Sequence, residues 1–269
     1  MRRVCVVTGA NKGIGLEIAR GLAAADRDST VILACRNPSL GVKAQDELRR
    51  EGLNVEYMHL DVGSEESIAT FVSTMESKYA SIDSLCNNAA IAFKSADSTP
   101  FREQAEPTFS VNYFGTRSLT LQLLPLLRRS PRPRIVNVAS MSGHLRILQR
   151  NPSLQRRLAD DSSLSVEDID RVASAFVADV KSGSHEQRGW PSSCYGMSKL
   201  SLIAFSKALA RSEPTISVNA CCPGACATDM SSGRGNKSAK QGAQTPLLLL
   251  TTETPPSGQF WQDEKEIEW

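Results

Sequence analysis

Apolar residues along the chain follow two alternating patterns. Short, continuous apolar runs rich in β-branched residues are separated by longer stretches in which apolar positions recur every three to four residues. The runs predict strands over residues 3–7, 31–35, 55–60, 84–87, 135–138 and 216–220. The longer stretches predict helices over residues 14–25, 41–51, 64–79, 106–127 and 193–211.

Strands that are apolar along their whole length and alternate with helices are typical of a parallel sheet covered on both faces. Crossovers between parallel strands are right-handed, so the expected fold is an α/β, doubly wound parallel sheet of the Rossmann type. The chain has 269 residues, of which 41% are hydrophobic. This length suits a single domain over residues 1–269.

Composition and charge limit the kinds of partner that the protein is expected to bind and the cell compartment in which it is expected to work. The net charge of +2 implies no general affinity for nucleic acid or for a membrane surface. The apolar runs at the N-terminus and at Leu247–Leu250 are too short for a signal-peptide core or a membrane span. The seven cysteines come without a secretory signal, which favours reduced, buried thiols in a cytoplasmic protein. Cys222 and Cys226, with three scattered histidines, do not form a zinc pattern, so no metal is expected.

A glycine-rich segment, Thr8-Gly-Ala-Asn-Lys-Gly-Ile-Gly15, lies between the first predicted strand and the first predicted helix. Gly9, Gly13 and Gly15 would let the backbone turn tightly and approach a pyrophosphate at the helix N-terminus. A plain tight turn is the alternative, but the strand before and the helix after favour a dinucleotide site.

The residue after the second predicted strand indicates which dinucleotide is bound. A site for NAD usually has an acidic residue about 20 residues after the glycine loop. Here that place is taken by Arg36, and Lys12 adds a second cation within the loop. Two cations and no carboxylate favour the 2′-phosphate of NADP(H). A solvated surface arginine is the alternative interpretation of Arg36.

Tyr195 and Lys199 form the main candidate for catalysis. They are four residues apart in a predicted helix and therefore share one face. A nearby ammonium group is expected to lower the pKa of the phenol, which could then give a proton to a developing alkoxide.

Further motifs surround this pair and the glycine loop. They are Leu60-Asp-Val62, Asn87-Asn-Ala-Ala90, Asn112-Tyr-Phe-Gly115, Val138-Ala-Ser140 and Asn219-Ala-Cys-Cys-Pro-Gly224. Together these motifs make nearly the whole chain resemble the short-chain dehydrogenase/reductase family. A longer set resembles the monomeric NADPH-dependent carbonyl reductases within it. That set comprises Ala89-Ala-Ile-Ala-Phe-Lys94, Gly189-Trp-Pro-Ser-Ser193, Thr228-Asp-Met230 and the tail 258–269.

The resemblance implies a catalytic tetrad. Tyr195 would be the general acid, and Lys199 would lower its pKa and bind the nicotinamide ribose. Ser140 would polarise the carbonyl oxygen, and Asn112 would sustain a water link to the lysine. Alternatives are a strand-end cap for Ser140 and an exposed helical position for Asn112.

The resemblance also assigns residues to NADPH/NADP+ and to the substrate. Those implied for the cofactor are Gly9, Asn11, Lys12, Gly13, Ile14, Gly15, Arg36, Asp61, Val62, Asn88, Ala89, Tyr195, Lys199, Pro223, Gly224, Cys226 and Thr228. Those implied for the substrate pocket are Phe93, Met141, Trp190, Ala225 and Met230.

Two residues depart from the family pattern. Ala90 stands where the family usually has glycine, which puts the backbone geometry near the cofactor in question. Ala225 stands where a carbonyl reductase would have a large aromatic residue, so one wall of the substrate pocket is expected to be missing.

A long insertion, residues 142–190, separates Ser140 from the catalytic helix. Ser165 and Asp168 predict a capping box, and Ile169, Val172 and Phe176 lie at helical spacing, so they should form a buried face. By resemblance, the insertion covers the surface used for tetramer contacts and makes the protein a monomer. A lid over the substrate pocket is an alternative role, and both could hold.

The function expected from these features is NADPH-dependent reduction of aldehydes, ketones and quinones to alcohols, with glutathione adducts as further candidate substrates. A dedicated alcohol or steroid dehydrogenase is the alternative within the family. A non-catalytic NADP-sensing protein is the alternative outside enzymes.

Overall fold

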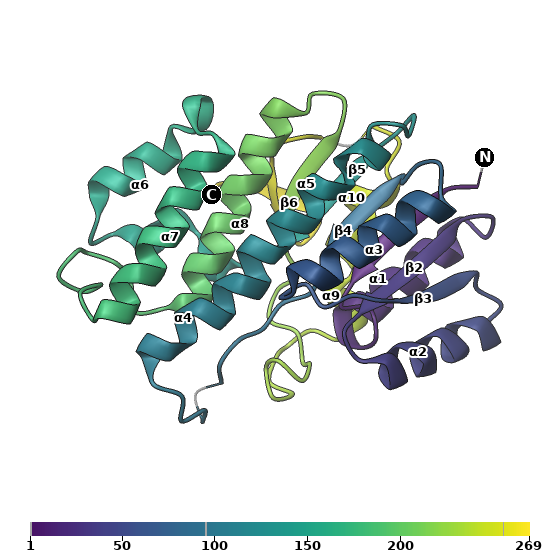
Figure 1. Cartoon of the computed structure of the whole chain (residues 1–269), viewed down its shortest axis with the longest axis horizontal. Coiled ribbons are helices and arrows are strands. Elements are labelled where there is room, and N and C mark those ends of the chain that lie inside the picture. Colours follow the sequence, from purple (N-terminus) through teal and green to yellow (C-terminus); the bar gives the residue numbers. More distant parts are fainter. Residues whose placement is uncertain (1, 95, 255) are drawn as a thin grey trace.

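An eight-stranded sheet forms the centre of the computed structural model, which describes residues 2–94, 96–254 and 256–269 (Figure 1). Its strands lie in the order β3-β2-β1-β4-β5-β6-β7-β8. All neighbours are parallel except β7 and β8, which form an antiparallel hairpin. The strands are β1 (Val4–Thr8), β2 (Thr30–Cys35), β3 (Val55–His59), β4 (Ser84–Asn87), β5 (Arg134–Val138), β6 (Ser217–Cys222), β7 (Phe260–Gln262) and β8 (Lys265–Ile267).

Helices cover both faces of this sheet, as the apolar strands predict. They are α1 (Gly13–Ala25), α2 (Pro38–Arg50), α3 (Glu65–Lys78), α4 (Phe101–Phe109), α5 (Thr116–Leu127), α6 (Pro152–Ala159), α7 (Val166–Ser182), α8 (Cys194–Ser212), α9 (Ala239–Gly242) and α10 (Gln244–Thr251). Short 3₁₀ turns span Met141–Gly143, Leu145–Leu148 and Asp161–Ser163. The predicted doubly wound α/β fold is therefore confirmed.

Alternate side chains of β1 enter two different hydrophobic clusters on the two faces of the sheet. In β1, Val4 and Val6 belong to the cluster that includes the buried faces of α3, α5 and α8. Cys5 and Val7 belong to the opposite cluster, which α1, α2 and α10 complete. This alternation follows from the two-residue period of a strand.

The six predicted strands are present, each ending within two residues of the expected position. The predicted helix over residues 106–127 begins earlier, at Phe101, because Phe101 and Ala105 pack against the core and bring the preceding turn into the helix. It is also interrupted by a π-helical turn, Ser110–Gly115. The β7–β8 hairpin was not expected, since strands of three residues are too short to show a hydrophobic period.

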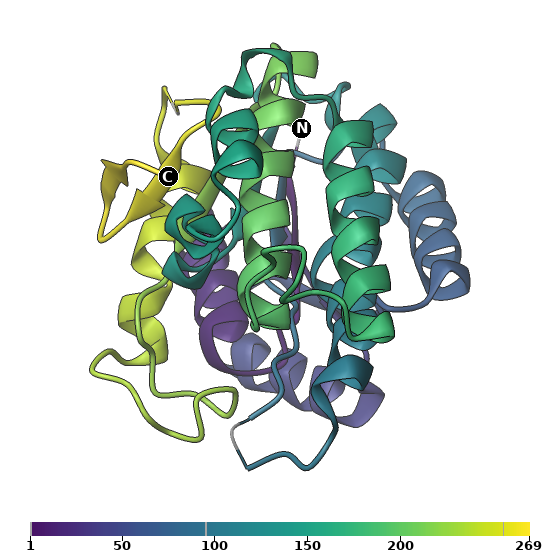
Figure 2. The ribbon, with the colours of Figure 1, turned by 90° about the vertical axis from the view of Figure 1, so that its left-hand side faces the viewer.

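The insertion forms helices that pack beside α4 and α8. Its main helix, α7, packs on α4 and α8, and Figure 2 shows the green α7 beside the lighter green α8. The predicted capping box between Ser165 and Asp168 is present. Ile169, Val172 and Phe176 are buried, which confirms the expected apolar face.

Candidate active site

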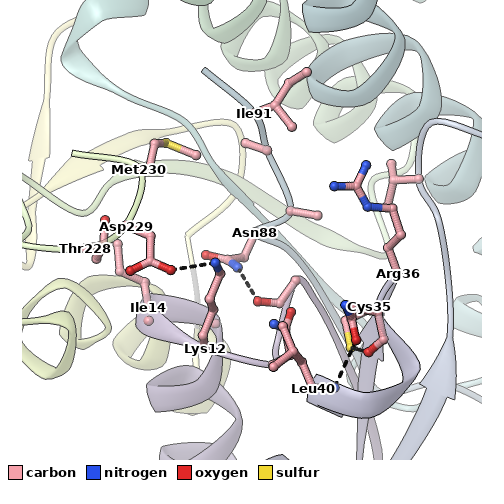
Figure 3. A pocket seen from close by; sticks show the side chains of 18 of the residues that line it. Lys12, Ile14, Cys35, Arg36, Leu40, Asn88, Ile91, Thr228, Asp229 and Met230 are labelled. Atoms are coloured by element: carbon pink, nitrogen blue, oxygen red, sulfur yellow. Dashed lines mark hydrogen bonds and ion pairs between the residues drawn. The ribbon is translucent and has the colours of Figure 1, made fainter. Parts of the chain in front are cut away.

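A cleft of about 630 Å³ opens at the carboxyl ends of β1, β2, β3 and β4 (Figure 3). Open parallel sheets bind their ligands at this edge. The residues expected at the cofactor that line the cleft are Gly9, Asn11, Lys12, Gly13, Ile14, Gly15, Arg36, Asp61, Val62, Asn88, Ala89 and Thr228. Lining residues that the resemblance did not assign to the cofactor or the substrate are Cys35, Asn37, Leu40, Leu60, Ala90, Ile91, Val111, Ala227 and Asp229.

The glycine loop needs its glycines for two different reasons. Gly9 and Gly13 have φ angles of +65° and +57°, which favour glycine. Gly15 is needed for close packing, because a Cβ there would lie 2.4 Å from the Gly9 carbonyl oxygen and 2.5 Å from Asn88 Nδ2. Helix α1 begins at Gly13, and no side chain caps its first N–H groups. These N–H groups can therefore donate to a phosphate in the cleft.

Asn88 ties the glycine loop to the end of β4. Its Nδ2 donates to the carbonyl oxygens of Thr8 at 2.9 Å and of Gly9 at 3.3 Å. The backbone N–H groups of Asn88 and Ala89 donate to Thr8 Oγ1 at 3.0 and 2.9 Å. Both strand ends are thus held in one arrangement at the floor of the cleft.

The two cations expected to bind the 2′-phosphate differ in their surroundings. The Lys12 ammonium lies 2.6 Å from a carboxylate oxygen of Asp229, in the loop after β6. Arg36 is exposed and has neither a hydrogen bond nor an ion pair with any residue that the structure describes. Figure 3 shows its guanidinium pointing into the cleft from the side opposite Lys12. Arg36 is therefore the cation that is free to meet a ligand.

The end of β3 and the π-helical turn close the adjacent side. A Cβ at Gly115 would lie 1.8 Å from the Val62 carbonyl oxygen, so only glycine lets the turn pack here. The Asp61 carboxylate accepts from the Gly63 N–H at 2.9 Å, and Asp61 is half-buried at the cleft wall.

Ala90 fits this site without backbone strain. Positive φ angles among the described non-glycine residues occur only at Ser232, Asp263 and Glu264. Ala90 is not among them, so its backbone does not adopt the conformation that would require glycine.

Tyr195 and Lys199 lie on the same face of α8, as their spacing predicts. The Lys199 ammonium is 5.7 Å from the centroid of the Tyr195 ring, and it donates to the Val138 carbonyl oxygen at 2.7 Å. Burial lowers the pKa of Lys199 to about 8. The pKa of Tyr195 is raised to about 12, mainly by burial. The neighbouring Cys222 also raises this pKa, and the hydrogen bond with Ser140 lowers it.

The expectation of a lowered Tyr195 pKa was therefore wrong, because desolvation of the phenolate is the largest effect and raises this pKa. The consequence is a phenol that keeps its proton at neutral pH. Such a phenol is a proton donor, which is the form that reduction of a carbonyl requires.

Ser140 lies two residues beyond β5, near enough to Tyr195 for its hydroxyl to lower the pKa of the phenol. The same hydroxyl oxygen accepts from the Ser142 N–H at 3.1 Å and so caps the 3₁₀ turn Met141–Gly143. The cap and the contact with the phenol are therefore both present.

Asn112 is fully buried in the π-helical turn, so its interpretation as an exposed helical residue was wrong. Its side chain accepts from the Ile91 N–H at 2.8 Å and donates to the Ile91 carbonyl oxygen at 2.9 Å. It also donates to Ser198 Oγ at 3.1 Å, and Ser198 donates to the Tyr195 carbonyl oxygen at 2.8 Å. Ser198, which the motif contains but the sequence did not single out, thus connects Asn112 to the catalytic helix. π-Helical turns often occur at functional sites.

The loop after β6 borders the cleft. Gly224 has a φ of +83°, and the Cys226 thiol donates to the Pro223 carbonyl oxygen at 3.4 Å. The Thr228 side chain lies near Gly13, since a Cβ there would be 3.7 Å from Thr228 Cγ2. The loop and the glycine turn therefore face each other.

The residues expected around the substrate are not all neighbours. Met230, 39% exposed, lines the cleft. Phe93 and Met141 are half-buried, and Ala225 is exposed. Trp190 lies inside the insertion, where its ring packs 5.6 Å from Phe176 and its N–H donates to Asp179 at 2.7 Å.

Other expectations concern metals, thiols and membranes. All seven cysteines are buried and free of disulfides, as expected. Within residues 2–94, 96–254 and 256–269, no group of three potential ligands could hold a metal ion. Nor does this part of the chain contain a helix with the length and apolar character needed to cross a membrane.

Comparison with known proteins agrees with this geometry. A family model described as short chain dehydrogenase matches residues 3–152. The chain is 39% identical to carbonyl reductase (NADPH) 1 of Mus musculus over 277 residues, covering 100% of this chain and 99% of that protein. The corresponding protein of Homo sapiens is 38% identical over 275 residues, with 99% and 98% covered.

Solved structures give the same picture. Salutaridine reductase from Papaver somniferum superposes with a TM-score of 0.88 at 34% identity, covering 97% of this chain and 100% of that one. Menthone neomenthol reductase from Mentha piperita gives a TM-score of 0.82 at 29% identity, covering 97% and 98%.

Proposed function

The chain belongs to the short-chain dehydrogenase family, and from this premise we propose that it reduces carbonyl compounds to alcohols with NADPH. The observation that carries the proposal is the meeting of Tyr195, Ser140 and Lys199 beside a cleft suited to a dinucleotide. Its full-length similarity to carbonyl reductases that carry NADPH in their names supports the same cofactor.

The cleft fits NADPH in three respects. The uncapped N–H groups of α1 suit the pyrophosphate, and the packing at Gly15 lets backbone approach it. The unpaired guanidinium of Arg36 suits the 2′-phosphate. When bound, NADPH supplies the hydride.

The residues of the chain then handle the proton and the developing charge. Tyr195 gives its proton to the carbonyl oxygen, and the hydroxyl of Ser140 donates a hydrogen bond to the same oxygen. The buried Lys199 ammonium places a positive charge beside the phenol, which stabilises the phenolate that remains. Asn112, held by Ile91 and Ser198, supports the water link through which the lysine regains protons.

The proposed substrates are aldehydes, ketones and quinones, with glutathione adducts included. The test is a panel of such compounds, menadione among them, with purified protein and NADPH absorbance as the readout. Oxidation of NADPH that depends on both enzyme and carbonyl is expected. Turnover restricted to one steroid or one alcohol would replace this function by that of a dedicated dehydrogenase. Binding of NADPH without any turnover would indicate a sensing protein.

We also propose that the protein acts as a cytoplasmic monomer. The support is that α7 already covers α4 and α8 within one chain, and that all seven cysteines are free thiols. Light scattering should give a mass near 29.2 kDa. A stable dimer or tetramer would contradict this.

A further inference from the structure

Trp269 connects the tail of the chain to the segment that carries Ser140. It lies two residues beyond β8, and its indole N–H donates to the Gly143 carbonyl oxygen at 2.9 Å. Its half-buried ring packs against the core, and the Lys207 ammonium of α8 lies 6.0 Å from the ring centroid.

The turn that accepts this hydrogen bond is held on its other side by the catalytic helix. A Cβ at Gly143 would lie 2.5 Å from the Leu200 backbone nitrogen and 2.6 Å from the Lys199 carbonyl carbon. The Gly143 N–H also donates to the Ser140 carbonyl oxygen at 2.9 Å. The 3₁₀ turn therefore lies between α8 and the tail, and Ser140 directly precedes it.

We propose that Trp269 is a positioning residue for Ser140. This inference rests on the proposed function, in which the Ser140 hydroxyl polarises the substrate carbonyl. The indole N–H sets the position of the Gly143 carbonyl, and the turn transmits that position to Ser140 through the Gly143-to-Ser140 hydrogen bond. A small displacement at a reacting group costs much in rate, which is why one distant hydrogen bond can matter.

A second tryptophan near the C-terminus provides a matched control for a substitution of Trp269. Trp261 in β7 is also half-buried, but its indole N–H has no hydrogen-bond partner among the residues described. Trp269→Phe and Trp261→Phe therefore make the same chemical change within the C-terminal segment 260–269. Only the first removes a hydrogen bond.

The experiment compares both variants with the unaltered full chain. W269F should lower kcat for carbonyl reduction by about tenfold, with the KM for NADPH unchanged, whereas W261F should leave kcat unchanged. Ser140→Ala and the double variant S140A/W269F complete a cycle. If Trp269 acts through Ser140, the double variant should be no slower than S140A.

A second readout does not depend on turnover. Hydrogen exchange of the amides in residues 140–143 should be faster in W269F and unchanged in W261F. Equal kcat in the two tryptophan variants, additive losses in the double variant, or unaltered exchange would each overturn the proposal. An unaltered chain that reduces no carbonyl would contradict the proposed function alone, since exchange would still decide whether Trp269 holds the turn.

Discussion

The two halves of the sheet build their sides of the cleft in different ways. Around β1–β4, the cleft is made mainly by backbone: three glycines, the uncapped start of α1, and the Thr8 and Gly9 carbonyl groups that Asn88 holds in place. Around β5–β8, the groups beside the cleft are side chains, of which Lys199 and Asn112 are buried and each bonded to another element.

This difference follows from what each half has to bind. A pyrophosphate can be held by N–H groups that any sequence supplies, provided that glycine allows the approach. A proton transfer needs particular functional groups with altered pKa values, so those groups must be buried and supported by neighbours. On the catalytic side, the insertion packs on α8, and the tail is hydrogen-bonded to the turn that follows Ser140.

The largest effect is expected where the insertion joins the catalytic half. Phe176 is fully buried, with ring centroids 5.4 Å from Phe109 and 5.6 Å from Trp190. Phe176→Ala should lower the free energy of unfolding by ~3–5 kcal/mol, measured by urea denaturation. Phe71→Ala, in the core beside β3, is the control and should cost a similar amount. A loss at Phe176 below ~1 kcal/mol would show that the insertion is a loose cover and no part of the core.

Tyr195→Phe tests the catalytic half directly. It keeps the ring and removes the acidic proton, so kcat should fall by about a hundredfold or more, with NADPH still bound. Tyr57→Phe is the control in the cofactor half, because the Tyr57 hydroxyl is buried without a partner among the described residues. Near-normal turnover by the Tyr195 variant would remove this residue from the mechanism.

The sequence predicts local features in both halves but not the contacts between segments that are far apart in the chain. The strands, the glycine loop and the pairing of Tyr195 with Lys199 follow from short motifs and local periods, so they could be predicted. The contacts of Lys12 with Asp229 and of Trp269 with Gly143 join residues 217 and 126 positions apart. No local pattern specifies such contacts, and the pKa of Tyr195 depends on burial that only the folded chain sets.

Arg36→Asp tests how the cofactor half selects its ligand. The carboxylate would repel a 2′-phosphate and can accept from a ribose hydroxyl. The ratio of kcat/KM for NADPH over NADH should fall by roughly ten- to a hundredfold, the scale of a hydrogen bond to a charged group. Lys12→Met should lower the ratio less, because the Lys12 ammonium is already paired with Asp229. A larger effect at Lys12 would reverse the assignment.

The pH dependence of kcat for reduction also tests the catalytic half, with a smaller expected effect than the substitutions above. Lys199, with its pKa lowered to about 8, is charged below that pH and loses its charge as the pH rises through it. Tyr195, with its pKa raised to about 12, keeps its proton over the same range. The kcat for reduction should therefore fall above about pH 8, while NADPH binding measured on the same series stays constant. A kcat that stays flat well above this pH would show that the Lys199 charge is not required.

The smallest effect is expected at Ala225, in the loop after β6. Ala225 is exposed, and its carbonyl oxygen accepts from the Lys237 N–H at 3.1 Å, so the backbone is held while the side chain has room to grow. Ala225→Trp should provide the aromatic wall and favour flat aromatic carbonyls by ~1 kcal/mol. The measurement is kcat/KM for a quinone against a small aliphatic aldehyde, with Ala80→Trp, exposed in the turn after α3, as the control. Equal changes for both substrates would mean that the side chain of residue 225 faces away from the substrate. Residues around β1–β4 would then form this side of the substrate pocket alone.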